Sequence, residues 1–267
     1  MTIAIGRELK ASYAFVERNF YLSKRYWGWE VAWFVYSAAG ALSITLIGQQ
    51  LGDERLIFYL LIGAIFWNYL SILFSFIAEQ IAWERWEGTL EYTMMAPVRR
   101  VSQLMGSVGY AVVYGLIHTA AILIVLVLFF GLDLAHANFA SAAVFMLIGS
   151  LSFVGIGTMA AVLPLIWVER GAQMTFVIQS VLLLVSGVYY SIEILPPWMQ
   201  VLAHFSPATY VLDGVRKTLI DGIPITELWY DVWPLVIMAV VLIPLGVYVF
   251  NRAERYAKRT GKLKRVG

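Results

Sequence analysis

The sequence WERWEGTLE at residues 83–91, followed by Ala96-Pro97, is a charged and aromatic block in a mostly apolar chain. It lies between two long hydrophobic stretches, and its charged side chains would be costly to place in a hydrocarbon core. In a helix its apolar residues would share one face, because they recur at three- and four-residue steps: Trp83, Trp86, Leu90 and Met94. Pro97 would end that helix. We expect an amphipathic helix over 83–97, either a linker between spans or a lever that receives force from a partner.

The composition identifies the chain as a polytopic membrane protein. Of its 267 residues, 61% are hydrophobic and 13% are charged, against roughly 45–50% and 25% in ordinary globular proteins. The chain has no cysteine, which excludes disulfides and thiolate metal sites.

Six apolar segments are long enough to be membrane spans, and their expected ranges are 31–48, 56–80, 104–131, 139–166, 172–190 and 232–250. Sixteen Lys and Arg residues then fall on the side of the termini and three on the other side. The positive-inside rule therefore places both termini and the 83–97 helix in the cytoplasm. The expected fold is a single all-α integral membrane domain over 1–267, in the cytoplasmic membrane.

Both ends of the chain are basic and are expected at the inner membrane surface. Residues 1–30 combine five Lys and Arg with apolar residues at near-helical spacing, which predicts an amphipathic interfacial helix. Residues 251–267 form a polybasic tail with seven more basic residues, which predicts contact with anionic lipid headgroups. Membrane lipids are thus expected partners, and nothing in the composition indicates nucleic-acid binding.

The segment before the last span is too apolar for an ordinary external loop. Pro196 and Pro197 suit a helix start, but ten helical residues cover only about 15 Å, half the hydrocarbon core. We therefore expect a re-entrant helical hairpin over 191–222 that forms an outer gate. The candidate gate residues are Tyr189, Tyr190, Leu195, Pro196, Pro197, Trp198 and Phe205. The two tyrosines fit an interfacial aromatic belt equally well.

The sequence lacks the motifs of common catalytic and nucleotide-binding sites. It has no G-x-x-x-x-G-K-[ST], no H-E-x-x-H and no G-x-S-x-G, and its three histidines are scattered. No Asp or Glu falls in the middle of an expected span, which argues against a proton- or sodium-coupled transporter. We expect no catalytic residue, no metal site and no cofactor in this chain, and an energy source on another chain.

Three polar residues within expected spans are candidates for a transport pathway: Asn68, His118 and Gln179. His118 fits packing between helices better than a pathway role, and the two amides fit interhelical hydrogen bonding as well as substrate contact.

Two stretches carry a resemblance to the permeases of type-2 ABC exporters. Residues 87–91 with Pro97 resemble that family's signature after the second span. Residues 186–198, followed by Ser206-Pro207-Ala208-Thr209-Tyr210, Asp213 and Arg216, resemble its outer signature before the last span, with Ser-Pro in place of the common Asn-Pro. The resemblance covers nearly the whole chain.

The resemblance implies a permease that dimerises and binds two copies of a separate ATPase, which would hold the ATP and Mg²⁺. It also implies that the helix after the second span is a coupling helix that docks on the ATPase. The coupling residues would be Trp83, Glu84, Arg85, Trp86, Glu87, Gly88, Thr89, Leu90 and Glu91. The tryptophans and Leu90 would anchor the helix, and the glutamates would present acidic contacts.

The expected function is the membrane-spanning subunit of an ATP-driven exporter, a non-enzymatic homodimer. Hydrophobic drugs or lipid-like molecules are the favoured substrates, because the spans offer few charges to a polar cargo. A lipid-linked polysaccharide or glycolipid is an alternative, since Phe66, Trp67 and Tyr69 could stack on sugar rings. A membrane scaffold that transports nothing is a second alternative.

Overall fold

A computed structural model describes residues 2–167 and 170–261. Within those residues the secondary structure is helical, with no strand. The helices are α1 (Thr2–Arg25), α2 (Trp27–Leu51), α3 (Glu54–Trp86), α4 (Leu90–Met95), α5 (Arg100–Phe130), α6 (Phe139–Ala160), α7 (Val162–Ile166), α8 (Gly171–Val185), α9 (Pro197–His204), α10 (Pro207–Ile220) and α11 (Trp229–Arg259), with short 3₁₀ turns at Ile192–Ile194 and Ile225–Glu227. The all-α prediction is confirmed.

Five helical stretches in the described chain are long and apolar enough to cross a membrane: α2, α3, α5, α6 together with α7, and α11. They correspond to five of the six expected spans. The sixth, 172–190, contains the 15-residue α8, which is about 22 Å long against a hydrocarbon core of about 30 Å. The helix is shorter than expected because the chain turns away after Val185, where Gly187 has φ 66°. A sixth crossing therefore stays a prediction.

Local signals in the sequence set the turns between spans. Gly52 ends α2 in the left-handed conformation, and the Asp53 carboxylate then accepts hydrogen bonds from the backbone N–H groups of Arg55 (2.9 Å) and Leu56. Gly131 ends α5 in the same way, and the Asn138 side chain caps α6. These caps satisfy backbone groups that a helix end leaves unpaired, and they produce the short connections between α2 and α3 and between α5 and α6.

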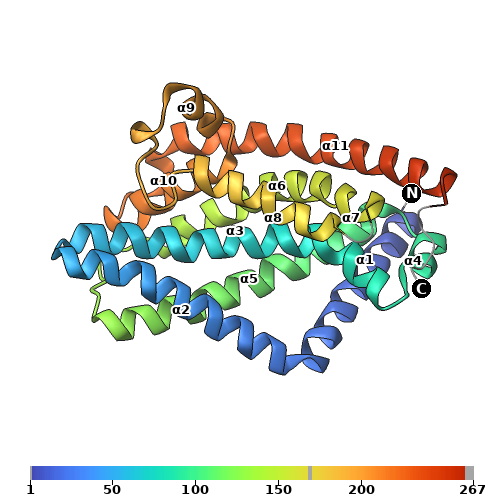
Figure 1. The fold of residues 1–267 in the computed structure, drawn as a ribbon, viewed down its shortest axis with the longest axis horizontal. Coiled ribbons are helices and arrows are strands. Elements are labelled where there is room, and N and C mark those ends of the chain that lie inside the picture. Colours follow the sequence, from blue (N-terminus) through green and yellow to red (C-terminus); the bar gives the residue numbers. More distant parts are fainter. Residues whose placement is uncertain (1, 168–169, 262–267) are drawn as a thin grey trace.

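Helix α3 runs through the middle of the bundle, between α2 and α5 on one side and α8, α6 and α11 on the other (Figure 1). Of its most apolar 18 residues, 67% are buried, against 28% of the corresponding residues in α2, α5 and α11. The main hydrophobic core is built around its side chains, with Tyr69, Leu70 and Leu73 fully enclosed. Helices α2, α5, α6 and α8 thus pack directly on α3, whereas α11 packs mainly on α6 and α1 mainly on α5.

Different helices form the two ends of the bundle (Figure 1). One end, called here the α4 end, holds α4, the crossing helix α1 and the C-terminal part of α11, while α9 and α10 lie at the opposite α9 end. Helix α1 packs tightly on α5, since a Cβ on Gly106 would lie 2.2 Å from the Ser12 carbonyl oxygen. The basic tail expected over 251–267 is helical to Arg259, and residues 262–267 lie outside the described chain.

Helices α6 and α11 approach each other through glycine. A Cβ on Gly155 would lie 2.4 Å from the backbone carbon of Leu242, and one on Gly246 would lie 2.6 Å from the carbonyl oxygen of Gly155. The Ser152 hydroxyl donates a 3.0 Å hydrogen bond to the Leu235 carbonyl in the same interface. Small residues allow such close backbone contact, which is the usual basis of helix association in lipid.

We therefore expect Gly155→Ala to destabilise the protein by about 1–3 kcal/mol, because the new methyl group meets backbone that must shift. The measurement is the apparent Tm of the purified protein in detergent. Gly109→Ala is the matched control, since a Cβ there meets no atom within 4 Å. Equal Tm values for both variants would contradict the close α6–α11 contact.

Candidate functional site

A cleft of about 940 Å³ lies between α2, α3 and α8, with contributions from the end of α1 and from α5. Its walls are largely membrane-spanning helix, and eleven of its lining residues within the described chain are aromatic. A cleft of this size is in the range of small-molecule binding sites.

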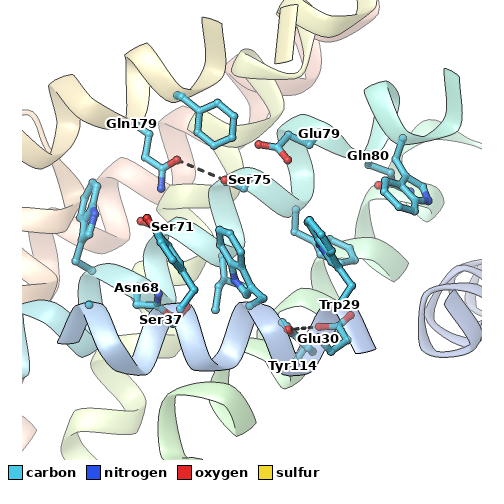
Figure 2. Close-up of a pocket in the computed structure, with 18 of the residues that line it drawn as sticks. Trp29, Glu30, Ser37, Asn68, Ser71, Ser75, Glu79, Gln80, Tyr114 and Gln179 are labelled. Carbon is cyan, nitrogen blue, oxygen red and sulfur yellow. Dashed lines mark hydrogen bonds between the residues drawn. The ribbon is translucent and has the colours of Figure 1, made fainter. Parts of the chain in front are cut away.

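One wall of the cleft carries a row of polar side chains from α3 (Figure 2). Asn68, Ser71, Ser75 and Glu79 recur at three- and four-residue steps, so they share one face of the helix. Gln179 of α8 lies opposite, and the Ser75 hydroxyl donates a 3.4 Å hydrogen bond to its side-chain oxygen. The structure thus brings two of the three pathway candidates, Asn68 and Gln179, into one cleft.

Several polar atoms of this row have no hydrogen-bond partner in the described part of the chain. They are the Asn68 Oδ1, Ser71 Oγ and Glu79 Oε1 atoms, all enclosed. Buried polar groups in proteins are nearly always hydrogen-bonded. Polar atoms on the wall of a cleft that lack a partner within the protein therefore indicate that another molecule, such as water or a ligand, forms hydrogen bonds with them there.

His118, the third pathway candidate, does not line the cleft. It is buried, and its ring lies 5.5 Å from that of Phe34 and 5.8 Å from that of Tyr114, measured between centroids. Packing between α5 and α2 accounts for this placement. Tyr114 itself reaches the cleft, where its hydroxyl donates a 2.5 Å hydrogen bond to the Glu30 carboxylate.

The segment expected as one helix over 83–97 is interrupted. Helix α3 continues without a break to Trp86, the chain turns at Gly88 with φ 72°, and α4 begins at Leu90. The prediction of a single helix is wrong at this point, because a left-handed glycine ends an α-helix. The predicted apolar stripe is split in consequence, with the two tryptophans on α3 and the remaining residues on α4.

The two halves of the stripe face different surroundings. Leu90 and Met94 are buried in a small core with Leu165 of α7 and Ala257 of α11. Trp83 and Trp86 line the cleft instead. The outward surface of α4 consists of Glu91 with Tyr92 and Met95, which are 74% and 73% exposed. The sequence interpretation missed Tyr92 and Met95, although their three-residue spacing opposite Leu90 and Met94 was a signal that could have found them.

Glu84 does not present an acidic contact at the surface as expected. Its side chain is 1% exposed and forms a 2.8 Å ion pair with Arg18 of α1. The neighbouring Arg85 donates a 2.7 Å hydrogen bond to the carbonyl oxygen of Leu165, close to the C-terminus of α7, where a cation is favourable. These contacts join α1, α3 and α7 at the α4 end.

The segment expected as an outer gate contains short helices, and of the candidate gate residues only Tyr189 lines the cleft in the described chain. Pro197 begins α9 as the sequence predicts, and Pro207 begins α10 in the same way. Trp198 and Phe205 point outward and are 66% and 75% exposed. Tyr189 is the gate candidate that lines the cleft, whereas the Tyr190 hydroxyl donates to the carbonyl oxygen of Leu184.

Arg216 of α10 anchors this outer segment. Its guanidinium donates hydrogen bonds to the carbonyl oxygens of Gly187 (3.0 Å) and Val188 (2.5 Å), and it stacks 3.5 Å from the ring centre of Tyr59 on α3. Burial lowers the pKa of Arg216 to about 10, so the group stays charged at pH 7. The turn after α8 is thereby tied to both α10 and α3.

We expect Arg216→Leu to destabilise the protein by about 2–4 kcal/mol, since two hydrogen bonds from a charged donor are lost. The stability of Arg216→Lys should lie between that of Arg216→Leu and that of the wild type, because an ammonium lacks the planar fork and the stacking surface of a guanidinium. Thermal unfolding in detergent measures both. Arg55→Lys is the control, since its 3.3 Å pair with Asp221 is exposed and such pairs contribute little. A Tm for Arg216→Leu equal to that of the control would contradict the anchoring role.

The described residues hold no group of three or more His, Asp or Glu side chains suited to a metal ion. The site consists instead of a cleft in the membrane-spanning region and a helix junction at the α4 end. Continuous α3 connects the two.

Comparisons with known proteins agree with this arrangement. The sequence pattern of the ABC-2 type transporter family matches residues 11–220. The chain is 25% identical over 174 residues to the inner membrane transport permease YadH of Escherichia coli K12, covering 64% of this chain and 67% of the relative. It is 23% identical over 176 residues to the probable multidrug ABC transporter permease YbhR of the same organism, covering 64% of this chain and 46% of the relative.

The family match covers well over half of the chain, both halves of the junction at the α4 end and all of the cleft-lining helices. The protein is therefore a multi-pass membrane permease that belongs to the ABC-2 type transporter family.

Proposed function

We propose that the chain is the membrane-spanning subunit of an ATP-driven exporter, which works as a homodimer with two copies of a separate ATPase. The observation that carries this proposal is the continuity of α3, which forms a wall of the cleft and ends at the segment 87–95. A push on that segment reaches the cleft through an unbroken helix. The 16 to 3 bias of basic residues supports a cytoplasmic α4 end.

The surface offered to an ATPase would be the outward side of α4. Glu91, Tyr92 and Met95 combine an acidic group with exposed apolar area, and they are held on a helix whose opposite side is packed into the bundle. An anchored helix transmits displacement to α3, α7 and α11, which it contacts through the small core of Leu90 and Met94. Glu87 at the turn adds a second carboxylate beside this surface.

The favoured cargo is a hydrophobic or lipid-like molecule that leaves through the cleft toward the α9 end. The walls of the cleft are mainly apolar and aromatic, and the relative YbhR is described as a probable multidrug permease. A polysaccharide is disfavoured by the placement of the aromatic residues that could stack on sugars. Phe66 and Tyr69 are packed in the core, and Trp67 alone of the three lines the cleft. A scaffold without transport would have no need of the cleft.

The partner is tested by copurification of the tagged protein from its native membrane. We expect an ATPase with a phosphate-binding loop to accompany it, in a ratio of one to one. If the protein is isolated repeatedly without such a subunit, the proposal fails.

The coupling role is tested by Glu87→Arg combined with Glu91→Arg, measured in the reconstituted complex. Reversal of charge on the proposed docking surface should abolish transport while the permease remains folded and the ATPase still hydrolyses ATP. Glu193→Arg is the control, because it also reverses the charge of a glutamate but lies at the α9 end. Transport by the double variant at the wild-type rate would remove the coupling role from this segment.

A further inference from the structure

Glu79 is a carboxylate on the wall of the cleft (Figure 2), and no Lys or Arg of the described residues forms an ion pair with it. It is mostly buried, and its Oε1 atom is enclosed and has no hydrogen-bond partner in the described chain. Two arginines at this end of the bundle contact other groups: Arg18 forms an ion pair with Glu84, and Arg85 donates a hydrogen bond to the carbonyl oxygen of Leu165. A carboxylate in apolar surroundings is unfavourable unless it is paired, and in membrane helices such groups mark functional sites.

The cleft as a whole favours positive charge. The charged residues among its described lining are Arg18, Glu30 and Glu79. Arg18 is neutralised by its ion pair with Glu84, and the Glu30 carboxylate accepts a hydrogen bond from Tyr114. The remaining field is therefore negative, and walls of low dielectric constant strengthen it.

Aromatic rings adjoin Glu79 along the cleft. Phe76 and Trp83 lie one turn before and one turn after it on α3, and both line the cleft. The ring of Trp83 lies 5.1 Å from that of Trp86 and 5.7 Å from that of Tyr26, between centroids. Faces of such rings attract organic cations, and their area also binds the apolar body that such a molecule carries.

The same features disfavour other ligands. A neutral hydrophobic molecule would gain nothing from the unpaired carboxylate, and an anionic lipid or a sugar phosphate would be repelled by it. A metal ion would need more ligands, and the described residues around Glu79 supply no group of three acidic or histidine side chains. An apolar molecule with a permanent or protonated positive charge matches every part of the site.

We propose that the cleft recognises lipophilic organic cations and that the Glu79 carboxylate selects their positive charge. This inference rests on the proposed function, since it names the substrate class that the cleft would carry. The carboxylate pairs with the cationic centre, while Trp83 and its aromatic neighbours hold the apolar groups. The pair replaces the hydration that each charge loses on entering the cleft.

The test is equilibrium binding to the purified full-length permease in lipid nanodiscs. Tetraphenylphosphonium and tetraphenylborate are suitable probes, because they have nearly the same size and shape and opposite charge. Nile red serves as a neutral hydrophobic probe. The variant is Glu79→Gln, which keeps the shape of the side chain, and the control is Glu193→Gln, which lies outside the cleft. Tm and oligomeric state are measured for each protein.

We expect the wild type and the Glu193→Gln control to bind tetraphenylphosphonium in preference to tetraphenylborate. Glu79→Gln should bind the cation about tenfold more weakly, since an interaction with a charged group is lost, while its affinity for Nile red stays unchanged. The same variant should lose stimulation of the ATPase by tetraphenylphosphonium in the complex.

Four results would overturn the inference. Equal binding of the two charged probes, or cation binding that Glu79→Gln leaves unchanged, would show that charge is not selected here, and transport of neutral hydrophobic molecules by the ATPase complex would still support the exporter. A shift of Glu79→Gln to another oligomeric state would assign the carboxylate to assembly. A wild-type protein that binds no probe and moves no substrate with its ATPase would fail both proposals.

Discussion

The structure depends on one long helix that must keep its backbone hydrogen bonds within itself while it passes through the centre of the bundle. A bilayer offers no water to an exposed peptide group, so α3 (Glu54–Trp86) runs unbroken for 33 residues. The outer anchor, the cleft and the junction with α1 all involve side chains of this helix. Tyr59 meets the outer anchor Arg216, the row from Asn68 to Glu79 lines the cleft, and Glu84 holds α1.

This continuity explains how distant parts of the molecule can act on each other. The first break in the helix after the cleft is the turn at Gly88, and beyond it α4 is packed against α7 and α11 through Leu90 and Met94. In the coupling role that we propose, a force on the outside of α4 would act on several helices at once, because packed interiors have low compressibility and transmit strain. The Arg18–Glu84 ion pair brings α1 into the same unit.

Sequence patterns predicted much of this arrangement, and their errors have physical causes. Hydrophobic length predicted five stretches that are long and apolar enough to cross a membrane, but it overestimated the helical length of the segment 172–190, where the turn at Gly187 shortens α8. Helical periodicity predicted a single helix over 83–97, but periodicity ignores backbone conformation, and Gly88 adopts a positive φ. Glu84 looked like a surface charge because its partner, Arg18, lies 66 residues away.

The sequence by itself determined the membrane class and the family, and it predicts that the charged block lies outside the hydrocarbon core. These follow from composition and from short motifs, which act locally. The tertiary structure alone decided which side of α4 faces outward, that His118 packs away from the cleft, and that Glu79 stands on its wall among aromatic rings, with no ion-pair partner in the part of the chain that the structure describes. Such relations depend on which helices become neighbours, and the sequence pattern of one helix does not predict where the other helices pack.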